Sequence, residues 1–134
     1  MSALPTVDDP GATAPDEALK ILRGLLADVA GLRGALLGRV DGRPIASILP
    51  DHDEGATAAI VAASIGLGAR LADLTGEGAL QEIVVRSASG YVVLYSVGDR
   101  GVLTVLTAAT ANLARLHLEA RHVCTALADA VGRG

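Results

Sequence analysis

The feature that most constrains this chain is an uncharged stretch from Gly55 to Ala69, set inside a segment with helical character, Asp53–Leu74. An ordinary surface helix carries an apolar stripe opposite a charged one, whereas a helix that is apolar on all sides is covered on more than one side. In a chain of 134 residues one side can rest on a sheet, and covering the other takes a second molecule. The sequence therefore favours assembly over catalysis.

Length and composition indicate one domain with a purely aliphatic core. Residues 1–14 are expected to form a flexible N-terminal tail, and residues 15–134 the domain. Phe and Trp are absent, so Tyr91 and Tyr95 are the only aromatic residues. With a net charge of −4 and so few aromatic residues, the chain has neither the basic surface nor the stacking platform of a nucleic-acid binder.

The single cysteine, Cys124, fits a reducing compartment, and residues 1–15 lack the features of a signal peptide. The uncharged run is closed by Glu54 and Arg70, and it falls short of the ~20 apolar residues that a membrane span needs. We expect a cytoplasmic protein with no direct membrane insertion, recruited to a membrane only through its partners.

Periodicity and turn signals predict eight elements in the order helix, two strands, helix, three strands, helix. Short connections favour antiparallel neighbours, so the expected fold is α+β, a five-stranded antiparallel sheet with helices on both faces. Pro44 cannot donate to a strand ladder, which places the second strand at an edge. The expected ranges are Pro15–Ala30, Gly34–Val40, Arg43–Leu49, Asp53–Leu74, Leu80–Ser87, Tyr91–Val97, Val102–Thr107 and Ala108–Val131.

No catalytic, cofactor-binding or metal-binding set emerges from the polar residues. Asp51, Asp53 and Glu54 stand where helix caps belong, and capping is favoured over metal or acid-base roles. His117 and His122 are five residues apart, whereas helical zinc pairs use a spacing of four. The sequence assigns no role to these histidines or to Cys124.

Small residues form a row along the middle helix. Gly66-Leu67-Gly68 resembles the start of a dinucleotide fingerprint, but it lacks the third glycine and lies inside a helix. Each glycine costs roughly 1 kcal/mol in a helix interior relative to alanine. We interpret the row as a surface for close packing against a partner helix, the alternative being a composition that scatters Ala and Gly freely. The row comprises Ala58, Ala62, Gly66 and Ala69, with Ala63 and Gly68 nearby.

Several stretches in order resemble the roadblock/LC7 family, over about residues 16–131. They include the strand that begins Gly34-Ala35-Leu36-Leu37, the turn Asp41-Gly42-Arg43-Pro44, the Ala-rich middle helix, Gly90-Tyr91-Val92-Val93-Leu94, and Val102–Leu106 leading to Asn112-Leu113. The resemblance is to bacterial single-domain members, including those of actinobacteria that are encoded beside a small GTPase and a sensor-kinase-like protein.

The resemblance implies a profilin-like sandwich, with one helix on one face and two on the other, that forms homodimers or heterodimers. The middle helix and third strand would pair with their mates into one continuous sheet. The expected interface residues are Ala58, Val61, Ala62, Ile65, Gly66, Gly68, Ala69, Ala72, Leu80, Glu82 and Val84. Glu54, Arg70 and Asp73 are candidates for partner binding.

The function implied by the resemblance is a non-enzymatic, dimeric regulator or scaffold of a Ras-like small GTPase, with a sensor-kinase-like protein as a further partner. Arg39, Arg43 and Arg70 are not assigned a catalytic role. The alternative is a small-molecule-sensing module, because profilin-like sheets can hold a ligand between sheet and helix.

Overall fold

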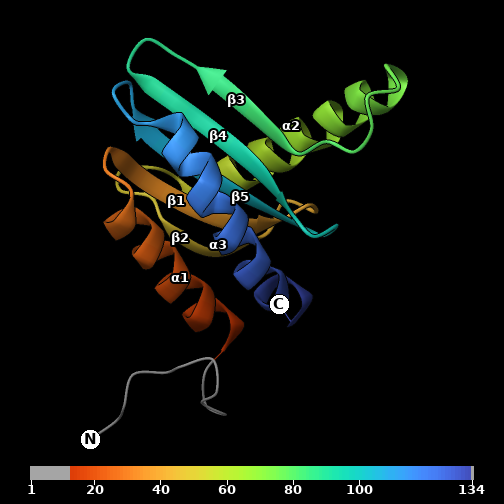
Figure 1. Cartoon of the computed structure of the whole chain (residues 1–134). Coiled ribbons are helices and arrows are strands. Elements are labelled where there is room, and N and C mark those ends of the chain that lie inside the picture. The colour runs from red at the N-terminus through yellow and green to blue at the C-terminus, as the bar shows by residue number, and fades with distance from the viewer. Residues whose placement is uncertain (1–12, 134) are drawn as a thin grey trace, which may run out of the picture.

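The computed structural model describes residues 13–133, and these form three helices and five strands (Figure 1). The order is the predicted one, helix, two strands, helix, three strands, helix. The elements are α1 (Ala14–Asp28), β1 (Leu32–Arg39), β2 (Pro44–Ile48), α2 (Glu54–Leu74), β3 (Glu82–Arg86), β4 (Gly90–Val97), β5 (Gly101–Ala108) and α3 (Leu113–Arg133).

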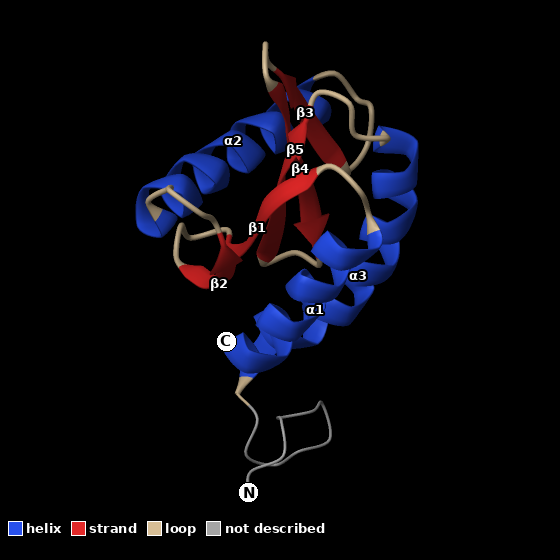
Figure 2. Ribbon diagram, turned by 90° about the vertical axis from the view of Figure 1, so that its left-hand side faces the viewer, coloured by secondary structure: helices blue, strands red, loops and turns tan. Residues whose placement is uncertain are grey.

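The strands form one antiparallel sheet in the order β2-β1-β5-β4-β3. Helices α1 and α3 pack side by side on one face, and α2 crosses the other face (Figure 2). The predicted sandwich, with one helix on one face and two on the other, is therefore confirmed. The sheet has two edges, β2 and β3, and Pro44 lies on the first of them as its missing N–H requires.

Side-chain caps fix where the helices begin. Thr13 forms a capping box with Asp16 at the start of α1, and the Asp53 carboxylate accepts a hydrogen bond of 2.9 Å from the Ala56 N–H at the start of α2. The last helix begins at Leu113, so the predicted start at Ala108 is wrong. Strand β5 continues through Ala108, and the side chain of Asn112 then caps α3.

The core is divided unequally by the sheet. A large cluster fills the space between the sheet and the α1–α3 pair, and its fully buried members include Leu22, Leu37, Leu103, Leu116 and Leu127. The cluster beneath α2 has four buried members, Val61, Ile65, Leu94 and Val102. The two faces therefore differ in how completely one chain covers them.

Helix α2 is long and apolar enough to cross a membrane by length and composition, which the count of uncharged residues did not predict. Its inward side nevertheless packs on the sheet as part of the domain, through Val61 and Ile65. The predicted tail, residues 1–14, lies almost entirely outside the described residues; Thr13 caps the first helix and Ala14 begins it.

Candidate functional site: the outer face of α2 and the edge of β3

Helix α2 has one buried side and one exposed apolar stripe. Ala58, Val61 and Ile65 are buried against the sheet. On the opposite side, large apolar side chains at spacings of seven, four and three residues form a single stripe along the helix. Their exposed fractions lie between 64% and 79%. The stripe consists of Ile60, Leu67, Leu71 and Leu74.

The stripe leads toward the open edge of the sheet. Helix α2 runs diagonally from the β2 side, where Ala59 lies near Gly42, to the β3 side, where Gly68 approaches Ile83 (Figure 2). On β3 the side chains of Val84 and Val85 are 40% and 48% exposed. We call the outer stripe together with Val85, which shares the α2 side of β3 with Ile83, the α2–β3 surface; it comprises Ile60, Leu67, Leu71, Leu74 and Val85. Val84 lies on the opposite side of the same strand, with Glu82. Exposed apolar area of this kind marks an interaction site.

Gly66 and Gly68, the two glycines in the middle of α2, have different surroundings. A Cβ added to Gly68 would lie 2.7 Å from Cδ1 of Ile83, so this glycine lets α2 approach the sheet of its own chain. A Cβ added to Gly66 would meet no atom within 4 Å. Of the two, Gly66 alone faces open space, and the predicted row of small residues is therefore not one uniform surface.

The structure corrects part of the predicted interface. Ala58, Val61 and Ile65 are buried against the sheet of their own chain, so these three are not outer contact residues. The apolar spacing alone did not indicate which side of the helix lies on the sheet. The interface itself stays a prediction, and the residues that keep exposed area for it are Ala62, Gly66, Gly68, Ala69, Ala72, Leu80, Glu82 and Val84.

An open groove of about 870 Å³ runs along the flank of α2, between the helix and the β4–β5 turn. Two of the predicted partner-binding residues, Arg70 and Asp73, line it together with Ala62, Gly66 and Ala69. The third, Glu54, lies at the other end of α2 and accepts a hydrogen bond from the Ser47 hydroxyl. The structure therefore does not bring the three partner-binding candidates together.

A polar chain ties the edge strand to α3. The Tyr95 hydroxyl lies 2.6 Å from Nδ1 of His117, and Nε2 of the same ring lies 3.1 Å from the Glu82 carboxylate. Burial, and then the charge of Glu82, raise the pKa of Tyr95, so its hydroxyl keeps its proton. The neutral ring can then accept from Tyr95 through Nδ1 and donate to Glu82 through Nε2. His117 thus links β3 and β4 to α3, a contact that the sequence did not predict.

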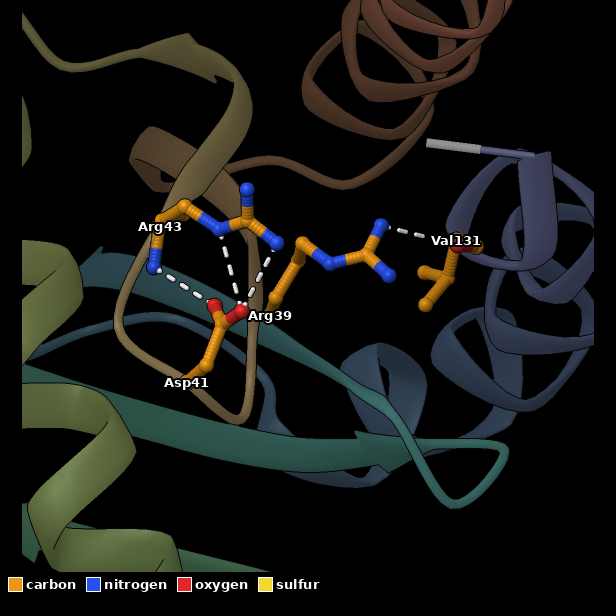
Figure 3. Close-up of polar contacts among 4 residues, drawn as sticks. All are labelled: Arg39, Asp41, Arg43 and Val131. Carbon is orange, nitrogen blue, oxygen red and sulfur yellow. Dashed lines mark hydrogen bonds and ion pairs between the residues drawn. The ribbon is translucent and has the colours of Figure 1, made fainter.

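Two arginines near the β1–β2 turn have structural partners (Figure 3). The Nε of Arg43 donates to the Asp41 carboxylate at 3.0 Å, and this hydrogen bond holds the pKa of Asp41 below its usual value. Arg39 donates to the backbone carbonyl of Val131 at 3.1 Å, near the end of α3. Arg39 thus links the end of β1 to the end of α3, whereas the Arg43–Asp41 pair is local to the exposed turn.

The remaining candidates for chemistry do not converge. Within residues 13–133, no group of three His, Cys, Asp or Glu side chains is placed to hold a metal ion. His122 is exposed on α3. Burial raises the pKa of the Cys124 thiol to about 11, which leaves it protonated at neutral pH and a poor nucleophile.

These elements define a class, a three-layer α+β domain with one incompletely covered face. The family model of the Roadblock/LC7 domain matches residues 19–107, and the chain belongs to this family. A curated relative, the uncharacterized protein MJ0310 of Methanocaldococcus jannaschii, is 32% identical over 89 residues, which are 66% of this chain and 77% of that protein.

Two solved structures share the fold. A roadblock/LC7 domain from Streptomyces avermitilis has a TM-score of 0.77 at 23% identity, covering 81% of this chain and 92% of that one. The gliding protein MglB of Thermus thermophilus has a TM-score of 0.81 at 23% identity, covering 92% of this chain and 94% of that one. The predicted recognition of the family, including its bacterial single-domain members, is confirmed.

Proposed function

We propose that the chain is a non-enzymatic, dimeric regulator or scaffold of a Ras-like small GTPase, acting in the cytoplasm through a surface built on paired α2 helices. The observation that carries the proposal is the exposed stripe of α2, Ile60, Leu67, Leu71 and Leu74, which continues to an open sheet edge. Membership of the Roadblock/LC7 family supports the GTPase as partner, because binding of such GTPases is what the resemblance implies.

A second protein chain covers this surface better than a lipid bilayer would. Membrane-surface helices combine their apolar face with several Lys and Arg residues, which meet anionic lipid headgroups. Along α2 the only basic residue is Arg70, and the whole chain carries a net charge of −4. An apolar stripe with an adjoining strand edge instead suits the same two elements of a second copy. Such an interface should bury more than ~1,000 Å².

The described charged residues support a role in binding over a role in chemistry. Arg39 and Arg43 donate to groups of their own chain, Val131 and Asp41. Arg70 lines the open groove beside α2, where it can contact a partner. Regulation through this surface would therefore work by stabilising one shape of the bound GTPase and not by inserting a catalytic arginine.

A binding experiment tests the proposal. The immobilised chain is presented with Ras-like GTPases encoded in its own genome, each loaded with GDP or with a non-hydrolysable GTP analogue. We expect one GTPase to bind with a preference for one nucleotide, and Leu67→Arg to abolish that binding. Leu118→Arg is the matched control, because Leu118 is 55% exposed on α3, the opposite face. Failure of every GTPase to bind, or equal loss in both variants, would contradict the proposal.

The groove beside α2 keeps small-molecule sensing as a second candidate. Its volume, about 870 Å³, is within the range of ligand sites, and polar side chains (Arg70, Asp73, Asp99) stand among small apolar ones. Native mass spectrometry of the purified chain distinguishes the two functions. A stoichiometric small molecule, released on unfolding and excluded by Ala62→Phe, would favour sensing; its absence would favour the groove as part of a protein interface.

A further inference from the structure

Strand β3 has a sequence that complements itself in antiparallel pairing. Its five residues are Glu82, Ile83, Val84, Val85 and Arg86, with an acidic residue at one end and a basic residue at the other. When two such strands run antiparallel with Val84 opposite Val84, each Glu82 lies opposite the Arg86 of the other chain. Directly opposed residues point to the same face of a sheet, so these charges would meet.

The backbone of β3 is oriented for this pairing. The Gln81 carbonyl accepts from Ser96, and the Ser87 N–H donates to Gly90, so the odd-numbered residues of this strand turn their backbone groups toward β4. Because these groups alternate along an antiparallel strand, those of Glu82, Val84 and Arg86 point to the open edge. A register centred on Val84 pairs each of these outward residues with another outward residue.

Neighbouring registers are poorer. Because backbone groups alternate along β3, two β3 strands can pair only in registers that set outward residues opposite one another. The nearest alternatives are centred on Ile83 or on Val85. Centring on Ile83 sets Glu82 opposite Val84, and centring on Val85 sets Arg86 opposite Val84. Either shift shortens the ladder and leaves both charges without a partner across the seam.

We propose that β3 pairs with β3 of a second copy of this chain in the one register centred on Val84, with Glu82 and Arg86 as the residues that specify it. The inference rests on the proposed dimer and adds its register and its specificity. One oxygen of Glu82 lies against His117, which fixes the side chain on the α3 side of the sheet, and a carboxylate can accept from an arginine at the same time. Twofold pairing also covers the β3 edge of both chains, so a third copy cannot add at β3.

The opposite edge of the sheet is unsuited to such pairing. Pro44 opens β2 without an N–H to donate, and α1 packs against this strand. Edge strands that natural proteins do not use for pairing are blunted in this way, whereas β3 carries no proline. The asymmetry of the two edges makes β3 the edge that a second copy extends.

Charge reversal tests the register. Glu82→Arg and Arg86→Glu should each raise the dissociation constant of the homodimer about tenfold or more, because two attractive pairs become two repulsive ones. Arg86→Glu leaves the His117 contact intact, which controls for damage to that contact. An equimolar mixture of the two variants restores both pairs across a heterodimer, so it should associate more tightly than either variant alone. The doubly reversed chain also restores both pairs and should do the same.

Cysteine cross-linking tests the register independently, because it shows which residue of β3 lies opposite itself in the second copy. In a Cys124→Ala background, Val84→Cys should form an intermolecular disulfide on mild oxidation, because directly opposed hydrogen-bonded residues have Cα atoms ~5.5 Å apart. Val85→Cys is the control and should not, since the two copies would be offset beyond the ~7 Å limit for a disulfide. A wild-type dimer whose mixed variants gain nothing, or which cross-links through Val85→Cys, overturns the register and leaves the proposed function standing. A monomeric wild type overturns both.

Discussion

The two faces of the sheet are covered to different degrees by helices of the same chain. The face covered by α1 and α3 holds a large cluster with Leu22, Leu116 and Leu127 at its centre, all fully buried within one chain. The face crossed by α2 holds four buried residues, and α2 leaves four large apolar side chains exposed above them. One face is therefore a complete core, and the other leaves large apolar side chains in solvent.

The difference shows how this fold separates stability from assembly. Burial of aliphatic side chains on the α1–α3 face supplies folding free energy that does not depend on a partner. The α2 face keeps its apolar area outside, where it can contribute only when another surface covers it. Mutations on the two faces should accordingly have different consequences.

Truncation of a large side chain separates the faces most clearly. Leu116→Ala should lower the free energy of unfolding by about 2–5 kcal/mol, because it leaves a cavity in a complete core. Leu67→Ala, on the exposed stripe, should leave the unfolding of the isolated chain within about 0.5 kcal/mol of wild type and weaken self-association instead. Urea denaturation at low protein concentration, together with sedimentation, measures both. Equal destabilisation by the two variants would contradict the comparison.

The link between the faces runs through His117. His117→Ala removes the contacts with Tyr95 and Glu82 and should lower stability by about 1 kcal/mol. Because Glu82 is on the edge strand, amide hydrogen exchange should quicken in β3 more than in β5. His122→Ala, an exposed position on the same helix, is the control and should change neither quantity. Uniform exchange throughout the sheet would show that His117 does not position β3.

Gly66 and Gly68 distinguish the side of α2 that faces solvent from the side that approaches the sheet. Gly66→Ala should stabilise the isolated chain by roughly 0.5–1 kcal/mol, since alanine is the better helix former and the added Cβ meets open space. Gly68→Ala should gain less or destabilise, because its Cβ would lie 2.7 Å from Ile83. Thermal unfolding of both variants gives the comparison. The opposite order would mean that α2 sits on the sheet in a different rotation.

The smallest effect concerns Cys124. Burial raises its pKa to about 11 in the folded chain from an ordinary value of 9.0. The folded state therefore keeps the thiol proton while the unfolded state loses it, so stability falls as pH rises from about 9 toward 11. The rate of alkylation by iodoacetamide should rise only above pH 9, with the urea-unfolded chain as control. A folded chain that reacts as fast as the unfolded one at pH 8 would contradict the burial.

Much of the fold was predictable because it depends on local signals. The prolines, the Asp41-Gly42 turn, the apolar periods and the ordered family motifs predicted all eight elements and the two-sided sheet. The start of α3 was missed because the cap formed by Asn112 lies beyond a strand that continues to Ala108. A cap is a single side chain, and apolar periodicity does not reveal it.

The site was predicted less completely, since it depends on which side of α2 faces the sheet. The sequence indicated that one side of α2 lies on its own sheet and the other side on a second chain. It assigned Ala58, Val61 and Ile65 to the second chain, whereas these residues face the sheet. The rotation of α2 is set by contacts with strands distant in sequence, such as Gly68 with Ile83. The contact of His117 with Glu82 is likewise long-range, and the outward orientation of Arg86 depends on how β3 pairs with β4.

The proposed dimer requires that a second copy of this chain covers the exposed stripe of α2. Sedimentation equilibrium of the full chain at micromolar concentration tests it most directly. The account predicts a mass twice the 13.5 kDa of one chain for wild type and for Leu118→Arg, and a monomer for Leu67→Arg. A wild-type monomer at these concentrations, with the α2 stripe left in solvent, would contradict it.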